Sequence, residues 1–209
     1  SEEDKLAIYF YNDSQWEYIG GIIDKNNKSI SVDVKHFTIF AVICDDVAPE
    51  IDIISPKNNQ YILNVNEFVF TYNETGSGVD TNSIIINIDD KDYNLSDFDY
   101  NLTGNNFTGR LKNTLSNGQH LYYVKLNDRV NNWVKSSVIN ITVPDKFDVL
   151  SFHCYPNPFN PSAGAHFVYY LTKIPDSVKI YIYDINGSLL KTIDGDRNIN
   201  KNDMIWDGR

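Results

Sequence analysis

Short runs in which apolar and polar residues alternate recur along the whole chain, each followed by a cluster of Asn, Asp, Gly or Ser. In SVKIYIY, residues 177–183, the side chains of Val178, Ile180 and Ile182 fall on one face of a strand and the residues between them on the other. No stretch of twelve residues keeps the i, i+3, i+4 apolar spacing of an amphipathic helix. The pattern therefore predicts an all-β chain of packed sheets.

The first of three predicted parts is residues 1–45 of the 209-residue chain. We expect strands at Leu6–Tyr11, Trp16–Ile23, Ser29–Val34 and Phe37–Cys44, separated by Asn- and Asp-rich turns. Four strands in so short a segment make a small sheet with little core of its own. We therefore expect this part to complete a sandwich that begins upstream of Ser1.

The second predicted part is residues 46–144, which follow the linker DDVAPEI. About 100 residues with seven or so short strands match an immunoglobulin-like sandwich. The expected strands are Glu50–Ile54, Glu67–Tyr72, Ser83–Ile88, Asn106–Leu111, His120–Asn127 and Ser137–Val143.

The third predicted part is residues 145–209, in which the stretch YPNPFNPS (155–162) follows the first strand. Three prolines remove three backbone donors and hold the residues before them extended, so this stretch cannot join a central ladder. We expect a stiff crossover that leaves Tyr155 and Phe159 free to enter the core. The expected strands are Asp148–Tyr155, Ala165–Leu171, Ser177–Tyr183, Leu189–Ile193 and Asp203–Trp206.

The charge and the longest apolar runs exclude two classes of partner. The net charge of −10 argues against nucleic acid, which needs a basic face to neutralise phosphate. No apolar run approaches the length that crosses a bilayer. The two cysteines, Cys44 and Cys154, are separated by a whole predicted domain, so we expect two free, buried or half-buried thiols rather than a disulfide.

Residues 148–209 resemble the immunoglobulin-like domain of the flagellar hook-capping protein, through YPNPFNPS, FVYYL, VKIYIYDINGSLLKTI and IWDG. The same pattern occurs in C-terminal domains of many secreted bacterial proteins, some of which sort their parent to type IX secretion. In that family two further strands follow the last motif. The resemblance therefore implies a truncated third module and an exported or surface-attached parent protein.

The other two parts also resemble modules of bacterial surface proteins. Residues 46–144 are similar to immunoglobulin-like repeats, through Pro49–Pro56, Gly76–Asp80, Gly118–His120 and the turn Asp128–Asn132. Residues 1–45 resemble the end of a β-sandwich module, through LAIYFYNDSQWEYIGG (6–21) and VKHFTIFAV (34–42). Some relatives of that module cut their own backbone at His-Phe-Ser. The overall prediction is a tandem array of immunoglobulin-like sandwiches, the first and last incomplete.

The sequence His36-Phe37-Thr38 is the one candidate for chemistry. In a strained turn the Thr38 hydroxyl could attack the Phe37 carbonyl with His36 as general base, and water would then cleave the ester. The alternative is structural: the apolar residues of this stretch belong to a strand core, and His36 stands where the strand begins. These apolar residues are Phe37, Ile39, Phe40 and Val42.

The acidic stretch NIDDKDYN (87–94) could bind calcium, because Asp89, Asp90 and Asp92 offer several of the six to eight oxygens that calcium takes. The alternative is a solvated hairpin, since the spacing lacks the Asp-x-Asp-x-Asp-Gly pattern of a loop site. Neither zinc spacing nor a phosphate loop is visible. The three tryptophans could form a sugar-binding platform, or could pack across strands: Trp16, Trp133 and Trp206.

These observations predict a non-catalytic region without a cofactor. It would space, anchor or export an upstream domain of the same parent chain, together with secretion or cell-surface machinery. Two alternatives remain open: adhesin or carbohydrate-binding sandwiches, and a self-cleaving module at His36–Thr38. The predicted location, secreted or at the bacterial cell surface, rests on the family resemblances alone.

Overall fold

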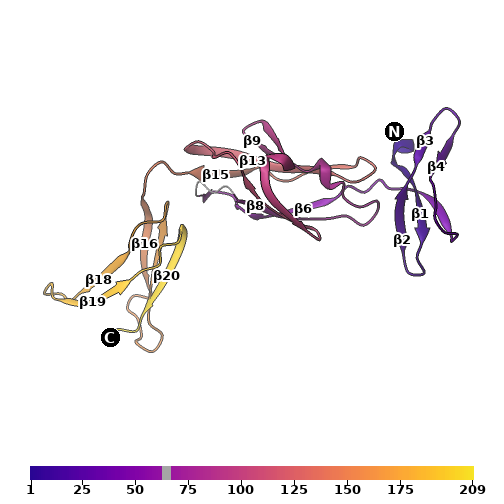
Figure 1. Cartoon of the computed structure of the whole chain (residues 1–209). Helices are drawn as coiled ribbons and strands as arrows, with labels where there is room; N and C mark the ends of the chain where they lie inside the picture. Colours follow the sequence, from indigo (N-terminus) through magenta and orange to yellow (C-terminus); the bar gives the residue numbers. More distant parts are fainter. Residues whose placement is uncertain (63–66) are drawn as a thin grey trace. The chain divides into compact units, whose positions relative to one another are not determined.

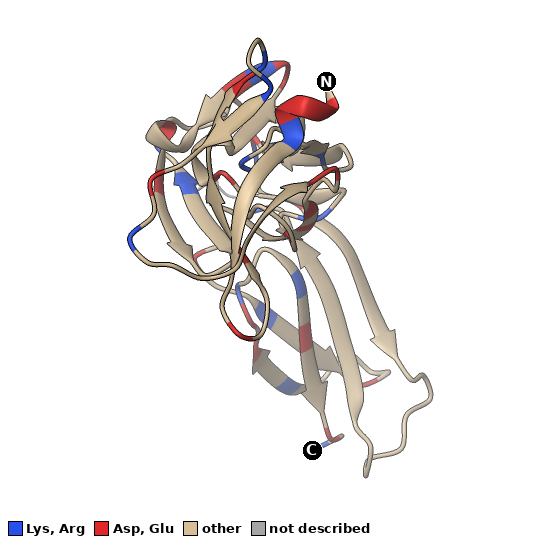
Figure 2. Ribbon diagram, turned by 90° about the vertical axis from the view of Figure 1, so that its right-hand side faces the viewer, with Lys and Arg blue, Asp and Glu red and all other residues tan. Residues whose placement is uncertain are grey.

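The computed structural model describes residues 1–62 and 67–209. Strands make up 53% of the chain and helix 5%, which confirms the prediction of an all-β fold. None of the helices in the described part is long and apolar enough to cross a membrane. Figure 1 shows the strands, and Figure 2 shows acidic and basic residues spread over many of them, with an acidic first turn at Glu2–Lys5.

The chain divides into two compact units whose boundaries cut across the linear sequence. Unit 1 comprises Ser1–Lys57, Glu67–Asn113 and Leu121–Ile139. Unit 2 comprises Asn58–Asn66, Thr114–His120 and Asn140–Arg209. Among the described strands, each sheet takes its members from one of the three predicted ranges 1–45, 46–144 and 145–209. The division into three modules stays a prediction.

A small sheet opens unit 1, with strand order β2-β1-β5, and the β3–β4 hairpin accompanies it. The predicted strand Trp16–Ile23 is broken in two, because Gly20 and Gly21 adopt φ values of 101° and 143°. A Cβ on Gly21 would also lie 2.8 Å from the Ile30 side chain. The elements are β1 (Leu6–Tyr11), β2 (Trp16–Gly20), β3 (Ile22–Asp24), β4 (Ser29–Ser31) and β5 (Phe40–Cys44).

Strand β5 begins three residues later than predicted. Its pairing with β1 starts at Phe10–Phe40, so residues 37–39 lie before the ladder. Phe37 is 100% exposed and Ile39 64% exposed. The prediction that they are core residues was therefore wrong, because no second layer covers them in the described part of the chain.

Two further sheets of unit 1 pack face to face as a sandwich. One has the order β11-β12-β8-β6, and the other contains β10, β9 and β13 with β14 added to β13. Their strands are β6 (Glu50–Ser55), β8 (Glu67–Asn73), β9 (Ile85–Ile88), β10 (Lys91–Asn94), β11 (Phe98–Thr103), β12 (Asn106–Leu111), β13 (Gly118–Asn127) and β14 (Trp133–Lys135).

Aromatic rings join the two layers of the sandwich. The Phe68 ring meets Tyr122 of the opposite sheet edge-on, with centroids 5.0 Å apart. Within the sheet of Phe68, the Phe70 and Phe107 rings stack with their centroids 4.7 Å apart. The phenol of Tyr122 is buried, which raises its pKa, and it donates a hydrogen bond to the Pro56 carbonyl (2.5 Å). Such contacts exist because every second residue of each strand faces the other layer.

The sequence missed strands β10, β11 and β14. Each pairs along one side of a neighbour, so few of its side chains need to be apolar. Strand β10 contains no buried residue, and β11 buries only Phe98. Their polar composition hides the alternation that identifies a buried strand.

Unit 2 contains a three-stranded sheet of order β16-β17-β20 and the ribbon β18-β19. It also contains residues 140–143 of β15, which pair in parallel with β7. Strand β18 buries Ile180 and leaves Tyr181 and Tyr183 exposed, as its alternation predicts. Ile180 packs with Phe167, Tyr169 and Leu171 of β17. The strands are β7 (Gln60–Tyr61), β15 (Ile139–Val143), β16 (Val149–Tyr155), β17 (Ala165–Leu171), β18 (Lys179–Tyr183), β19 (Leu189–Asp194) and β20 (Asn200–Trp206).

The ribbon covers only part of the β17 face. In the described chain β16 pairs with β17 alone and β18 with β19 alone, so each has a free edge. Phe152 of β16 stacks on Phe167 at 6.0 Å yet stays 52% exposed, and Val149, on the same face, is 46% exposed. The sheet β16-β17-β20 and its ribbon therefore present unpaired strand edges and an apolar face that is only partly covered.

The segment YPNPFNPS leaves the ladder after Tyr155, as its prolines predict. Phe159 packs against Trp206 with ring centroids 5.5 Å apart. Tyr155 does not enter the core: it stacks on His166 at 5.1 Å on the surface of the sheet and is 48% exposed. Its position as the last residue of β16, paired with His166, fixes it on that face.

We predict that Phe107→Ala destabilises the chain by about 3–5 kcal/mol, because a fully buried ring leaves a cavity when removed. Urea unfolding followed by tyrosine and tryptophan fluorescence measures this. Phe37→Ala is the matched control, since its ring is fully exposed and its loss should change the unfolding free energy by less than about 0.5 kcal/mol. Equal effects of the two substitutions would contradict the aromatic core described above.

Candidate functional site

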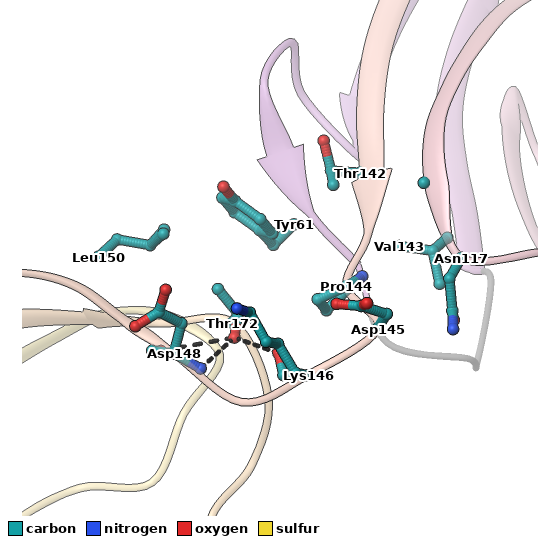
Figure 3. Close-up of a pocket in the computed structure, with 11 residues that line it drawn as sticks. Tyr61, Asn117, Thr142, Val143, Pro144, Asp145, Lys146, Asp148, Leu150 and Thr172 are labelled. Carbon is teal, nitrogen blue, oxygen red and sulfur yellow. Dashed lines mark hydrogen bonds between the residues drawn. The ribbon is translucent and has the colours of Figure 1, made fainter.

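An open cleft of about 350 Å³ lies in unit 2 beside the segment that connects β15 to β16. Figure 3 shows Tyr61 near Thr142, with Asp148, Leu150 and Thr172 on the other side of the space. The rest of the lining is Asn117, Gly118, Val143, Pro144, Asp145 and Lys146.

Hydrogen bonds to Thr172 hold the connecting segment at the floor of the cleft. The buried Thr172 hydroxyl accepts the Asp148 amide (2.8 Å) and donates to the Lys146 carbonyl (3.1 Å). The Lys173 ammonium adds a bond to the Asp145 carbonyl (2.6 Å). Because these bonds use backbone carbonyls, the carboxylate of Asp145 and the ammonium of Lys146 stay on the exposed rim.

A side-chain amide fixes the aromatic residue of the cleft. The Asn200 side chain accepts the Tyr61 amide (3.2 Å) and donates to the Tyr61 carbonyl (3.1 Å), which mimics a ladder pair. The lining thus combines one half-buried ring with amide, hydroxyl and carboxylate groups. This chemistry suits binding of a polar ligand, and the lining offers no histidine or cysteine for nucleophilic catalysis.

The structure separates the groups proposed for self-cleavage. The Thr38 hydroxyl donates to the Tyr11 carbonyl (3.2 Å). The His36 ring lies edge-on to Phe10 at 5.3 Å and stacks near Phe40 at 6.5 Å. Within the described chain no hydrogen bond joins His36 to Thr38, so the base and the nucleophile are not assembled in this conformation. Cleavage at this sequence stays a hypothesis.

The acidic stretch 87–94 forms a hairpin whose turn is Asp89-Asp90, both with positive φ. Asp89 accepts the Leu121 amide (2.9 Å). Asp92 accepts the Asn87 amide group (2.6 Å) and pairs with Lys125 (2.8 Å), and these two bonds lower its pKa. Among the described residues no group of three acidic, histidine or cysteine side chains is placed to hold a metal ion.

The tryptophans and cysteines do not gather into one site. Trp16 packs on Tyr11 and Trp206 on Phe159, whereas Trp133 is 53% exposed on β14. Cys44 and Cys154 are unpaired, as predicted. Both are exposed rather than buried, because each lies on a strand whose outer layer is thin or missing; Cys154, for example, faces the uncovered side of β16.

Sequence reasoning missed a cluster of buried polar residues in unit 1. Its members are Asp45, Ser77, Asp128 and Asn132, each at most 6% exposed. The sequence analysis identified the turn Asp128–Asn132, in which Asn131 has a left-handed φ of 67°. The contact of this turn with Asp45 could not be predicted from the sequence, because Asp45 and Asn132 are 87 residues apart and no local pattern links them.

Comparison with known proteins finds solved structures that are similar over most of this chain. No family model matches the sequence, and no curated protein matches it. The dimeric latent PorU of Porphyromonas gingivalis is similar over 78% of this chain and 17% of its own, at 18% identity and a TM-score of 0.39. This chain therefore spans about a sixth of that protein.

Two further solved structures are similar at still lower scores. The titin domains Z1Z2, solved with telethonin, match 76% of this chain and 81% of theirs, at 11% identity and a TM-score of 0.36. The glucan-locus protein SGBP-B of Bacteroides ovatus, solved with a mixed-linkage heptasaccharide, matches 73% of this chain and 44% of its own, at 14% identity and a TM-score of 0.29. At these values the likenesses carry no functional argument.

We predict that calcium does not stabilise this protein, because the Asp92 carboxylate is occupied by Asn87 and Lys125. Thermal melting with 5 mM calcium, about ten times an affinity of 0.5 mM, would raise Tm by several degrees if a weak site existed. The expected result is an unchanged Tm relative to a chelator control at matched ionic strength. A rise that Asp92→Asn abolishes would instead assign a calcium site to this hairpin.

Proposed function

We propose that this chain is a non-catalytic spacer and anchoring region of a larger exported bacterial protein. Its sheets would hold an upstream domain away from the cell surface, and residues 145–209 would act as the export or attachment module. The partners are then the upstream domain and the secretion or cell-surface machinery.

The connectivity of the sheets carries this proposal. Strand β5 ends at Cys44 and β6 begins at Glu50; β15 ends at Val143 and β16 begins at Val149. Each of these connections is five residues long, and the described strands on its two sides belong to different sheets. A series of separately paired sheets on short connections suits spacing, since each added module extends the chain without needing to enclose a site.

The export role of residues 145–209 rests on the resemblance of YPNPFNPS and the following strands to the hook-capping type of domain. The free edges of β16 and β18 and the exposed Phe152 support it, because a receptor could add a strand there. The proposed location outside the cell rests on the same resemblance.

Deletion of residues 145–209 from the chromosomal gene tests the export role. We expect the parent protein to disappear from the medium and the surface fraction and to accumulate inside the cell. Deletion of residues 1–144, which removes the small sheet together with the sandwich that covers it, is the control and should leave export intact. Unchanged export after the first deletion, with the protein folded and present at normal levels, would refute the role of residues 145–209.

A second candidate function is carbohydrate binding at the cleft around Tyr61, favoured by the combination of one ring with amide, hydroxyl and carboxylate groups. Sugars bind to such linings by stacking on the ring and by hydrogen bonds to the polar groups. On a glycan array we expect Tyr61→Ala to lose any signal given by the whole chain. Tyr100→Ala is the control, since Tyr100 is an exposed ring outside the cleft. A signal that both variants keep would exclude this cleft.

A further inference from the structure

The small sheet β2-β1-β5 has almost no core of its own. Of residues 1–44, all of them described, only Ala7, Tyr9 and Gly20 are buried. Three strands with one thin apolar face are not expected to be stable in water by themselves. Something outside the small sheet must therefore cover Ala7 and Tyr9.

The cover is the turn Asp128–Asn132 of the neighbouring sandwich. Val130, at its tip, is 4% exposed and forms one apolar cluster with Ala7 and Tyr9, which Tyr18 and Ile43 border. The Tyr18 ring meets Tyr9 edge-on at 5.6 Å. The Arg129 guanidinium lies over the outer side of the Tyr18 ring, 5.5 Å from its centre.

Side-chain bonds shape the turn before it meets the sheet. The fully buried Asp128 carboxylate accepts the amides of Val130 (2.9 Å) and Asn132 (2.8 Å) and the Asn132 side chain (2.6 Å). These bonds fix Val130 at the tip of the turn, because one carboxylate holds both the amide of Val130 and the amide of Asn132. The Arg129 amide also donates to the Gly78 carbonyl (3.0 Å).

Asp45, the residue after β5, closes the contact from the other side. Its carboxylate accepts the Ser77 amide (2.7 Å), and its carbonyl accepts the Asn132 side chain (2.7 Å). A Cβ on Gly76 would lie 2.4 Å from this carboxylate, so only glycine leaves room for it. The end of the small sheet is thus tied to two loops of the sandwich at once.

A metal ion does not explain this cluster of acids. The carboxylates of Asp45 and Asp128 are occupied by N–H donors, and Glu74 accepts the amides of Gly76 and Gly78. The buried hydroxyls of Tyr9 and Ser77 have no hydrogen-bond partner among the described residues. The small sheet is therefore held on the sandwich by the apolar contact of Val130. The hydrogen bonds that Asp45 accepts from Ser77 and Asn132 add to this contact.

We propose that the turn Asp128–Asn132, together with Ser77, is an intramolecular docking surface on which the small sheet depends for its folded state. The sheet and the sandwich then unfold as one cooperative body, and a pull on the N-terminal side is transmitted to the sandwich instead of unravelling the sheet first. This docking contact lies within unit 1, and the proposal does not depend on the export role proposed for residues 145–209.

Two single-tryptophan forms of the whole chain test the proposal. Trp16, on β2, reports the small sheet when Trp133 and Trp206 are replaced by Phe; Trp133 reports the sandwich when Trp16 and Trp206 are replaced. In thermal unfolding we expect the two forms to share one midpoint. Two separate midpoints, with Trp16 melting first, would overturn the proposal.

Substitutions in the sandwich, with Trp16 of the small sheet as the probe, provide a second test. Val130→Ser should lower the midpoint reported by Trp16 by about 5 °C or more, although Val130 lies outside the small sheet. Val138→Ser is the matched control at an exposed position of the same sandwich and should shift it little. A Trp16 midpoint that falls no further with Val130→Ser than with Val138→Ser overturns the proposal.

Two variants that each remove one negative charge keep the proposal testable if Val130→Ser fails to fold. Asp45→Asn weakens the bond to the Ser77 amide while keeping the size of the side chain. Asp46→Asn makes the same change at the adjacent, exposed residue. We expect only Asp45→Asn to lower the Trp16 midpoint, and equal midpoints for the two variants would overturn the role of Asp45.

Discussion

Packing of buried aromatic rings between the two sheets of the sandwich is the interaction on which the rest of this structure depends. Phe68, Phe70 and Phe107 of one sheet and Tyr122 of the other are almost completely buried. Burial of such rings supplies more apolar area per residue than any aliphatic side chain does. The sandwich therefore stays stable although its outer faces and turns are polar, and it can support the smaller sheet attached to it.

The sheets β2-β1-β5 and β16-β17-β20 each have a small apolar core, and their apolar faces are covered in different ways. The small sheet β2-β1-β5 buries Ala7 and Tyr9 against Val130. The sheet β16-β17-β20 has only the β18-β19 ribbon over it, and Phe152 stays about half exposed. An uncovered apolar face beside free strand edges favours association with another strand, which agrees with the proposed attachment role of residues 145–209.

Several buried polar side chains of the described chain hold turns and connections in place. Asp128 shapes the turn at Val130, Thr172 holds the connection before β16, and Asn202 accepts and donates bonds to the Asn198 backbone (2.9 and 2.7 Å). A short side chain that bonds to nearby backbone groups replaces missing ladder partners. Asp128 and Asn202 show how Asp and Asn side chains serve the turns of this chain.

The sequence by itself determined the all-β class and most buried strands, because a strand with one covered face must alternate. Strands β1, β12 and β17 begin and end where the alternation predicts. Tertiary structure alone decided that Phe37 is exposed, that the polar strands β10 and β11 exist, and that Asp45 meets Asn132 across the chain. These features depend on which layer covers a strand and on which distant residue supplies a partner, and alternation along one strand contains no information on either.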